Sequence, residues 1–163
     1  MAADVEFMTM ALDNGWSKES LQGAVDHFTN QLNTHYNAEV AGRTIIGDNP
    51  NDFSDVNYGN NQVEGPDAFH GTHVAGIIAA VRNNGIGNDG VADNVLIMSV
   101  RAVPDGDEAD KDVALAIRYA VDNGAQVVNM SFGKSYSPYQ EEVAKAIKYA
   151  EDKGVLLVHA AGN

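Results

Sequence analysis

The sequence predicts an α/β fold with a parallel sheet. From about residue 95 onward, short apolar runs of strand length alternate with amphipathic segments of helical length. Two helical segments also share a pattern at a separation of 30 residues, in which Val113, Ile117, Tyr119 and Gly124 are matched by Val143, Ile147, Tyr149 and Gly154. Two copies are too few for a solenoid, so we interpret them as successive βα units that present one face to the same sheet.

Residues 4–35 are expected to form helices. Apolar residues in the second half of this stretch are spaced i, i+4, i+7 and i+11, as in an amphipathic helix: Leu21, Val25, Phe28 and Leu32. Ser17 and Ser20 offer hydroxyl groups that can cap the start of that helix. Residues 43–46 are interpreted as a short strand, and residues 47–65, rich in Asn, Asp and Gly, as a loop.

The later elements follow in order. Residues 95–100, 126–131 and 155–159 are predicted strands, and residues 112–123 a helix with an apolar face of Val113, Ile117, Ala120 and Val121. Ser137 is expected to cap the next helix, with Pro138 at its first position and Gln140 completing a capping box. That helix ends near Lys153. Because ligands bind outside the carboxyl ends of parallel strands, we expect a site where the last two strands end.

Composition narrows the function. The chain of 163 residues carries a formal net charge of -13, which disfavours nucleic acid and anionic membrane surfaces as partners. It contains no cysteine, so disulfide and thiol chemistry are excluded. No segment has the pattern of a signal peptide or the length of a membrane span. The acidic run at residues 105–112 is interpreted as a solvated loop.

Three motifs carry most of the functional information. Residues 70–76 read HGTHVAG, residues 127–133 read VVNMSFG, and residues 160–163 read AAGN. Together they resemble the histidine motif, the substrate-binding strand and the oxyanion-hole motif of the subtilisin-like serine peptidases. The resemblance is strong from Asp67 to Asn163 and absent before about Arg43.

The resemblance implies a three-layer, doubly wound, mostly parallel sheet with helices on both faces. This subtilisin-like fold is incomplete here and carries a helical N-terminal insertion, with residues 1–65 as the insertion segment and residues 66–163 as a partial catalytic domain. It further implies a polypeptide substrate, no cofactor and a secreted or extracytoplasmic protein.

The resemblance also implies roles for individual residues. His70 corresponds to the general base and Asn163 to the side-chain donor of the oxyanion hole. Gly106 is assigned, by resemblance alone, to a facing substrate strand. The resemblance assigns Ser131, Phe132 and Gly133 to the strand that pairs with the substrate backbone. It assigns Ala160, Ala161 and Gly162 to one wall of the pocket for the residue that precedes the cleaved bond.

Two parts of a serine peptidase are absent from the sequence. The nucleophile motif Gly-Thr-Ser-Met-Ala does not occur, and neither Ser99 nor Ser131 stands in a comparable setting. The Asp-Ser-Gly or Asp-Thr-Gly motif is also absent, and neither Asp48 nor Asp67 matches it. We therefore interpret the sequence as the middle of a serine endopeptidase. The chain alone is expected to be inactive, and it is expected to self-associate through an exposed sheet edge. The alternatives are a noncatalytic peptide-binding or scaffold domain and a split enzyme completed by another chain.

Three histidines and one segment rich in Asn and Gly are candidate metal ligands. His73 lies one helical turn from His70, but no third ligand of suitable spacing accompanies the pair, so zinc is disfavoured. His159 is interpreted as a core or rim histidine. Residues 83–90 resemble a calcium loop, and an ordinary Asn/Gly turn is preferred, with calcium as the alternative.

Overall fold

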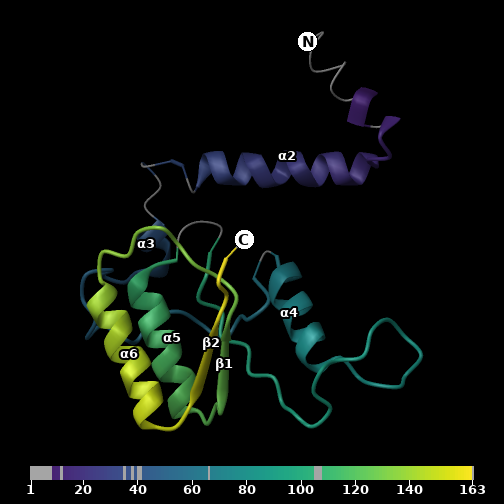
Figure 1. Cartoon of the computed structure of the whole chain (residues 1–163). Helices are drawn as coiled ribbons and strands as arrows, with labels where there is room; N and C mark the ends of the chain where they lie inside the picture. Colours follow the sequence, from purple (N-terminus) through teal and green to yellow (C-terminus); the bar gives the residue numbers. More distant parts are fainter. Residues whose placement is uncertain are drawn as a thin grey trace. The chain divides into compact units, whose positions relative to one another are not determined.

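The computed structural model describes residues 9–11, 13–34, 36–37, 39, 42–65, 67–104 and 108–162 (Figure 1). The chain divides into two compact units, Met1–Gly42 and Arg43–Asn163. The domain boundary expected between residues 65 and 66 lies inside the second unit. The loop-rich residues 43–65 therefore fold together with the segment that carries the three motifs.

The first unit contains a long amphipathic helix. α2, Lys18–Asn33, begins after Ser17, whose Oγ accepts a hydrogen bond of 3.1 Å from the backbone N–H of Ser20, as expected for a helix cap. Of the predicted apolar stripe, Leu21 is buried and the other three residues are exposed. Much of the preceding predicted helix lies outside the described residues. No helix in the described part of the chain is long and apolar enough to cross a membrane.

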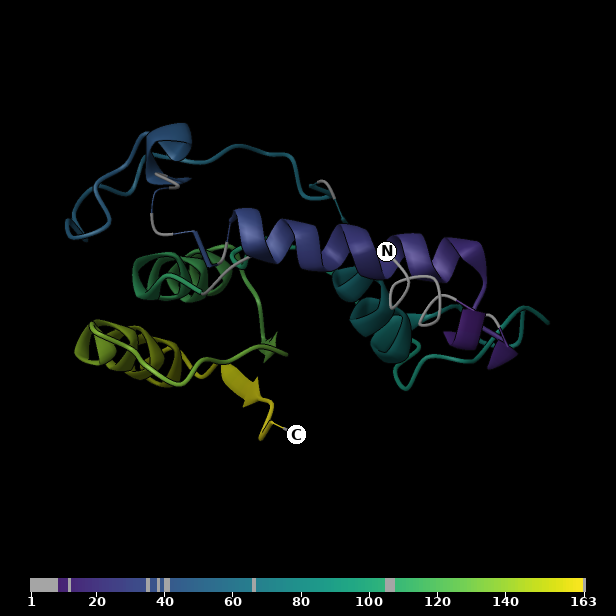
Figure 2. The same cartoon turned by 90° about the horizontal axis from the view of Figure 1, so that it is seen from above.

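In the second unit, two helices pack on one face of a two-stranded parallel sheet. The elements are α5 (Asp110–Asp122), β1 (Val127–Met130), α6 (Gln140–Asp152) and β2 (Leu156–His159). α5 and α6 lie side by side on the same side of the strands (Figures 1 and 2). The crossover from β1 through α6 to β2 is a βα unit of the predicted kind. The apolar face predicted for α5 is buried: Val113, Ile117, Ala120 and Val121.

The buried face of α6 consists of small residues. Ala146 and Ala150 are both 0% exposed, and their small side chains allow close packing in a core shared with α5 and with Met130 of β1. Ile147, the counterpart of Ile117 in the 30-residue pattern, is 44% exposed instead. The pattern therefore predicts the second helix correctly, but it does not predict which of its residues are buried.

α4, Phe69–Ala79, lies on the opposite side of the strands from α5 and α6 (Figures 1 and 2). After this helix the chain folds back, and the N–H groups of Gly90 and Val91 donate to the carbonyl oxygens of Ala80 and Ile77, both at 3.0 Å. These bonds satisfy carbonyl groups that the end of a helix leaves without intrahelical partners. Gly90 is buried, and a Cβ atom there would lie 2.4 Å from the backbone nitrogen of Ala80. The chain can therefore fold back onto the end of α4 only with glycine at this position.

Three local predictions are wrong. Residues 43–46 belong to a short helix, α3 (Gly42–Ile46), and form no strand; Ile45 is 89% exposed. Residues 95–100 form no strand, and the described sheet consists of β1 and β2. Ser137 does not cap α6, since its hydroxyl donates to the carboxylate of Asp110 at 2.9 Å and Tyr139 precedes the helix. In each case contacts with distant residues, or their absence, override the local preference.

The interpretation of the acidic run as a solvated loop is also wrong for its described residues. Glu108, Asp110 and Lys111 are 8%, 5% and 1% exposed. Each has a partner in another segment. Glu108 accepts a hydrogen bond from the N–H of Gly133 at 3.1 Å, Asp110 pairs with Lys134 at 2.8 Å, and Lys111 pairs with Asp48 at 2.9 Å. Buried charged groups require such partners, so these three residues belong to the interior of the second unit.

Candidate active site

The register of the sheet brings two of the predicted motifs together. β1 and β2 pair in parallel from Val127 with Leu156 to Met130 with His159. Just beyond the ladder, the N–H of Ala160 donates to the carbonyl oxygen of Met130 at 3.2 Å. The chain segments that follow the two strands therefore leave the sheet next to each other, at the edge where parallel sheets bind ligands.

A pocket of about 470 Å³ lies at this edge. Its lining includes all six residues that the sequence assigns to substrate binding: Ser131, Phe132, Gly133, Ala160, Ala161 and Gly162. Lys134, Ser135 and His159 complete the lining. Four of these nine residues are glycine or alanine, so an extended chain could approach the backbone closely.

Phe132 and His159 connect the two sides of the pocket. Their ring centroids are 6.3 Å apart and the rings are perpendicular, which is the edge-to-face arrangement that aromatic rings favour. A Cβ atom at Gly133 would lie 3.7 Å from Cε1 of the same imidazole. His159 is exposed, so of the two interpretations left open by the sequence it is a rim histidine.

Glu108 and Lys134 hold the segment that follows β1. Oε1 of Glu108 accepts the hydrogen bond from the N–H of Gly133, at 3.1 Å. The ammonium group of Lys134 donates to the backbone carbonyl oxygen of Glu108. Two adjacent residues of the pocket are therefore tied to the residues just before α5.

Asp110 extends this connection to residue 139. Its Oδ1 lies 2.8 Å from Nζ of Lys134, and its Oδ2 accepts a bond of 2.7 Å from the N–H of Tyr139. Burial opposes ionisation of Asp110, but Lys134 and the hydrogen bonds from Tyr139 and Ser137 outweigh it, so the pKa of Asp110 lies below its ordinary value. The carboxylate is thus the stable form in the folded chain.

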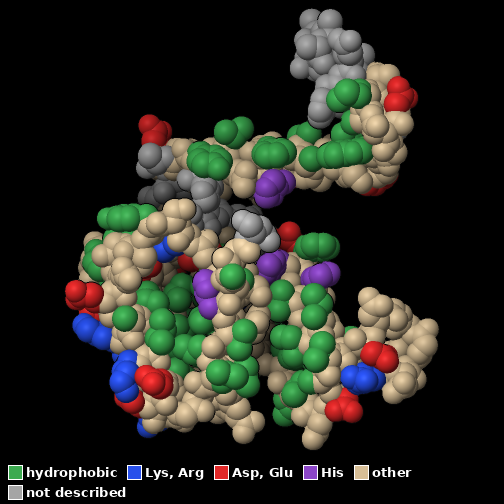
Figure 3. Space-filling view, in the orientation of Figure 1, with side chains coloured by type: hydrophobic (Ala, Val, Ile, Leu, Met, Phe, Trp, Pro, Cys, Tyr) green, Lys and Arg blue, Asp and Glu red, His purple; other side chains and the backbone are tan. Residues whose placement is uncertain are grey.

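His70 is the second residue of α4 and is exposed. The first turn of α4 and the carboxyl ends of β1 and β2 lie at the same end of the second unit (Figure 1), and histidine side chains gather at that end (Figure 3). His73 stacks on the ring of Phe69, with centroids 6.2 Å apart. The start of α4 is held by Asp67, whose Oδ1 accepts a bond of 2.8 Å from the N–H of Phe69.

No carboxylate in the described part of the chain orients the imidazole of His70. Asp67 bonds to the helix backbone instead. Asp48 has a fully buried carboxylate that pairs with Lys111 at 2.9 Å and with Arg43 at 3.2 Å. Burial opposes its ionisation, but these two cations hold the pKa of Asp48 below its ordinary value. Both aspartates therefore have structural partners.

Two predicted site residues lie outside the described residues: Asn163 and Gly106. Lys134 and Ser135 line the pocket and Glu108 contacts its lining, and none of the three is predicted from the sequence. Lys134 directly follows the predicted substrate strand, and that adjacency is a usable signal. Glu108 reaches Gly133 across 25 residues, and no sequence pattern connects the two.

Residues 83–90 form an Asn/Gly turn. The N–H of Asn83 donates to Oδ1 of Asp89 at 2.8 Å, which closes the loop. Asn83, Gly85 and Gly87 have φ angles of 57°, 73° and 61°, in the left-handed region that these residue types tolerate. No cluster of three His, Cys, Asp or Glu side chains that could hold a metal ion occurs among the described residues.

Comparison with known proteins identifies relatives of the chain. The family model described as the subtilase family, peptidase S8, matches residues 12–163, so the match begins well before Arg43, where the resemblance of the motifs ends. The thermophilic serine proteinase of Bacillus sp. (strain AK1) is 52% identical over 65 residues, which cover 39% of this chain and 16% of that protein. The cell wall-associated protease of Bacillus subtilis (strain 168) is 44% identical over 71 residues, covering 43% of this chain and 8% of that protein.

A third relative is the extracellular basic protease of Dichelobacter nodosus. It is 40% identical over 75 residues, covering 40% of this chain and 12% of that protein. The matched stretches therefore span less than a fifth of the length of each of the three relatives. No solved structure matches this chain.

Proposed function

Because the chain belongs to the subtilase family, we propose that it forms the histidine-bearing part of a serine endopeptidase that hydrolyses peptide bonds by acyl transfer. The observation that carries the proposal is the parallel register of β1 and β2, which brings Ser131–Gly133 and Ala160–Gly162 to one pocket. The three-layer, doubly wound sheet of a complete catalytic domain is part of the same proposal.

In the proposed reaction, His70 takes the proton of a serine hydroxyl while the hydroxyl oxygen attacks the substrate carbonyl carbon. His70 then gives that proton to the leaving amine, and water hydrolyses the acyl-enzyme by the same sequence of proton transfers. The side-chain amide of Asn163 donates a hydrogen bond to the oxyanion. The serine and the aspartate that orients His70 are assigned to residues outside this sequence, because neither motif occurs in it. The chain alone is therefore expected to be inactive.

The proposed substrate is an extended polypeptide. Its backbone lies beside Ser131–Gly133, in the manner of a strand added to a sheet edge. Ala160–Gly162 leave room for the side chain that precedes the cleaved bond. The net charge of -13 remains the argument against nucleic acid and anionic membranes as partners.

A noncatalytic peptide-binding or scaffold domain is the second candidate function. It is favoured by the presence of the pocket in a chain whose sequence lacks the serine and aspartate motifs. A split enzyme, in which another chain supplies both groups, would share the chemistry of the first candidate.

Two preparations test these candidates: the 163-residue chain and the complete protein that the full gene encodes. We expect the chain neither to cleave casein nor to react with a serine-directed fluorophosphonate, and the complete protein to do both. A stoichiometric adduct on a serine of the chain would contradict the assignment of the nucleophile. A complete protein that binds peptides but neither reacts nor cleaves would establish the noncatalytic function.

We also propose that the complete protein acts outside the cytoplasm, since relatives are described as cell wall-associated or extracellular. Recovery of the complete protein from the cytosolic fraction alone would contradict this. The proposed reaction itself uses no metal or cofactor. Calcium at residues 83–90 is the alternative to an ordinary Asn/Gly turn. A rise in the unfolding temperature with millimolar calcium but not with magnesium, which Asp89→Asn removes, would support the calcium alternative.

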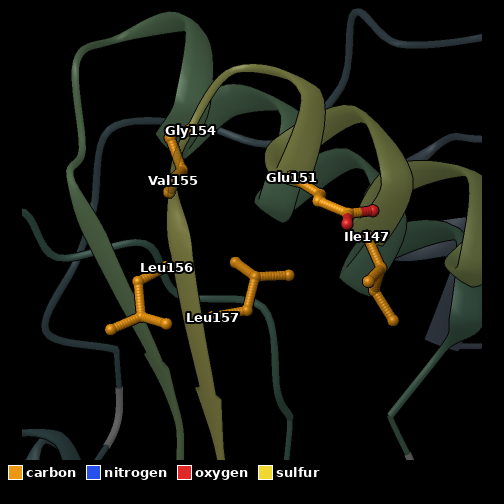
Figure 4. A pocket seen from close by; sticks show the side chains of 6 residues that line it. All are labelled: Ile147, Glu151, Gly154, Val155, Leu156 and Leu157. Carbon is orange, nitrogen blue, oxygen red and sulfur yellow. The ribbon is translucent and has the colours of Figure 1, made fainter.

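Self-association of the chain is proposed through the outer edge of β2. Among the described residues β2 pairs with β1 alone. A pocket of about 400 Å³ lies beside the free edge (Figure 4). Most of the residues that line it are apolar: Ile147, Val155, Leu156 and Leu157, together with Glu151 and Gly154. An unpaired edge with apolar neighbours recruits another strand, and a second copy of the chain supplies one.

Light scattering tests the self-association. We expect a dimer that is weakened by Leu156→Lys, because Leu156 is 60% exposed on the strand and a charge there opposes edge pairing. A clean monomer from micromolar to near-millimolar concentration would count against the proposal.

A further inference from the structure

The sequence contains three Asn-Gly pairs, which begin at Asn14, Asn84 and Asn123. In such a pair the backbone nitrogen of the glycine can attack the side-chain carbonyl carbon of the asparagine, because glycine has no Cβ atom to hinder the approach. All three asparagines are exposed, so access to solvent does not distinguish them. The hydrogen bonds that each pair makes determine which one can react.

In two of the pairs the side-chain nitrogen that would leave is bound to the preceding helical turn. Nδ2 of Asn14 donates to the carbonyl oxygen of Met10 at 2.7 Å, and Nδ2 of Asn123 donates to the carbonyl oxygen of Tyr119 at 2.8 Å. The N–H of Gly124 also donates to a backbone carbonyl oxygen, at 3.1 Å, so the attacking nitrogen is engaged as well. Both pairs must open locally before they can react.

At Asn84 the arrangement is reversed. Its Oδ1 accepts a hydrogen bond of 2.9 Å from the N–H of Ile86, whereas its Nδ2 and the N–H of Gly85 have no hydrogen-bond partner among the described residues. A donor at the carbonyl oxygen makes the carbonyl carbon more electrophilic and stabilises the charge that develops on the oxygen during attack. No atom lies within 4 Å of the position of a Cβ atom at Gly85, so the surroundings are open. The hydrogen bond at Asn84 therefore assists the reaction.

We propose that Asn84 is a site of spontaneous deamidation, which the fold selects over Asn14 and Asn123. Hydroxide removes the proton from the nitrogen of Gly85, and this nitrogen forms a bond to Cγ of Asn84. The bond from Cγ to Nδ2 breaks, and the departing nitrogen takes a proton from water and leaves as ammonia. Water then opens the succinimide ring at either carbonyl carbon, which gives aspartate or isoaspartate. This inference does not depend on the proposed peptidase function.

The reaction changes the turn that returns the chain to the end of α4. The N–H of Asn83 closes this turn by donating to Oδ1 of Asp89 at 2.8 Å, and the N–H of Gly90 then donates to the carbonyl oxygen of Ala80 at 3.0 Å. Both products place a negative charge near Asp89, and like charges repel. Isoaspartate also adds a side-chain carbon to the main chain, so the closed turn no longer fits. Deamidation should therefore loosen the packing of this turn on α4.

Ageing of the folded 163-residue chain in mildly alkaline buffer tests the site, with digestion and mass spectrometry to resolve the three asparagines. We expect conversion at Asn84 to be at least about tenfold faster than at Asn14 or Asn123, since their hydrogen bonds must break first. In guanidinium chloride the three sites should react at similar rates, because those bonds are absent. Equal rates in the folded chain, faster conversion at Asn14 or Asn123, or a preference for Asn84 that persists in the unfolded chain would overturn the proposal.

Thermal unfolding before and after ageing tests the effect on the turn. We expect the aged wild-type chain to unfold at a lower temperature than the fresh one. Asn84→Gln should keep its unfolding temperature on ageing, because the longer glutamine side chain would have to form a larger and less favourable ring. Asn123→Gln is the matched control and should lose as much as the wild type. Equal losses in all three proteins, or an unchanged temperature after full conversion of Asn84, would overturn the effect on the turn.

Discussion

Lys111 and Asp48 form an ion pair in the interior of the second unit. Nζ of Lys111 lies 2.9 Å from Oδ2 of Asp48, and the two side chains are 1% and 0% exposed. The same ammonium donates to the carbonyl oxygen of Asn49 at 2.8 Å and lies 4.4 Å from the centre of the Tyr58 ring. One cation of α5 therefore fastens the loop that precedes α4 to the core.

A second ion pair ties the same segment to α5. Nη1 and Nη2 of Arg43 donate to the two carboxylate oxygens of Asp112 at 3.1 Å and 2.9 Å, a bidentate arrangement. The hydroxyl of Tyr58 donates to the same carboxylate at 2.6 Å. Burial and the bond to Asp112 together raise the pKa of Tyr58 far above its ordinary value, so its hydroxyl remains a donor at any physiological pH.

Removing one partner of the buried pair should cost much more stability than removing both. Lys111→Met leaves the carboxylate of Asp48 buried with Arg43 as its remaining cation, and we expect a loss of about 3–5 kcal/mol in the free energy of unfolding. The double variant Lys111→Met, Asp48→Leu buries no uncompensated charge there and should be more stable than Lys111→Met. Urea unfolding followed by circular dichroism measures both values.

Lys148→Met is the matched control for this prediction. Lys148 pairs with Asp152 on the surface of α6, and their side chains are 63% and 61% exposed. An exposed pair of this kind contributes little, so the change in the free energy of unfolding should stay within about 0.5 kcal/mol. Equal losses in Lys111→Met and Lys148→Met would show that the interior pair is not a significant source of stability.

Asp110 should make the second unit sensitive to acid. Its pKa is lower in the folded chain than its ordinary value of 3.8, so the stability that it contributes is complete above that value and is lost as the pH falls below it. Asp110→Asn should therefore be less stable than the parent at pH 7 and show a shallower loss below about pH 4. Ser137→Ala, which removes one of the bonds that lower this pKa, should be intermediate. Urea midpoints between neutral and acidic pH provide the test, and identical slopes in all three proteins would refute it.

The helices and the pocket of the second unit could be predicted from the sequence because their signals are local. The apolar spacing of α5 matches its buried face, and the parallel register of two neighbouring apolar runs is sufficient to bring Ser131 and Ala160 to one edge. The helix at Ile45 and Ile46 could not be predicted, because a short run of branched apolar residues suits a strand and a helix equally.

Long-range charge pairing is the part of the structure that the sequence hides. Lys111 reaches Asp48 across 63 residues, and Glu108 reaches Gly133 across 25. A cluster of acidic residues has the same composition whether it is solvated or paired, so only the positions of its partners distinguish the two states. The hydroxyl of Ser137 illustrates the same point, since a good local capping residue bonds to a carboxylate 27 residues away.

Two glycines on either side of the end of α4 should respond in opposite ways to alanine. Gly90→Ala places a Cβ atom 2.4 Å from the backbone of Ala80, and relieving that overlap should cost about 1–3 kcal/mol in the free energy of unfolding. Gly76 lies within α4 with no atom near its absent Cβ, so Gly76→Ala should gain up to about 1 kcal/mol from helix propensity. Thermal unfolding compares the two, and a stabilised Gly90→Ala would contradict the observed return of the chain.

The roles assigned to His70 and Asn163 lead to a contrast in the complete protein. His70→Ala should lower kcat by about a millionfold, because a serine hydroxyl is a weak nucleophile without its base. His73→Ala is the matched control: this imidazole stacks on Phe69 one turn along the same helix, and its loss should leave kcat within a few fold if the variant folds. Asn163→Leu should reduce kcat by about a hundred- to a thousandfold with little change in KM, the usual loss of one oxyanion donor. Wild-type turnover in His70→Ala, or an effect of Asn163→Leu confined to KM, would remove the support for a catalytic role and favour the noncatalytic peptide-binding domain.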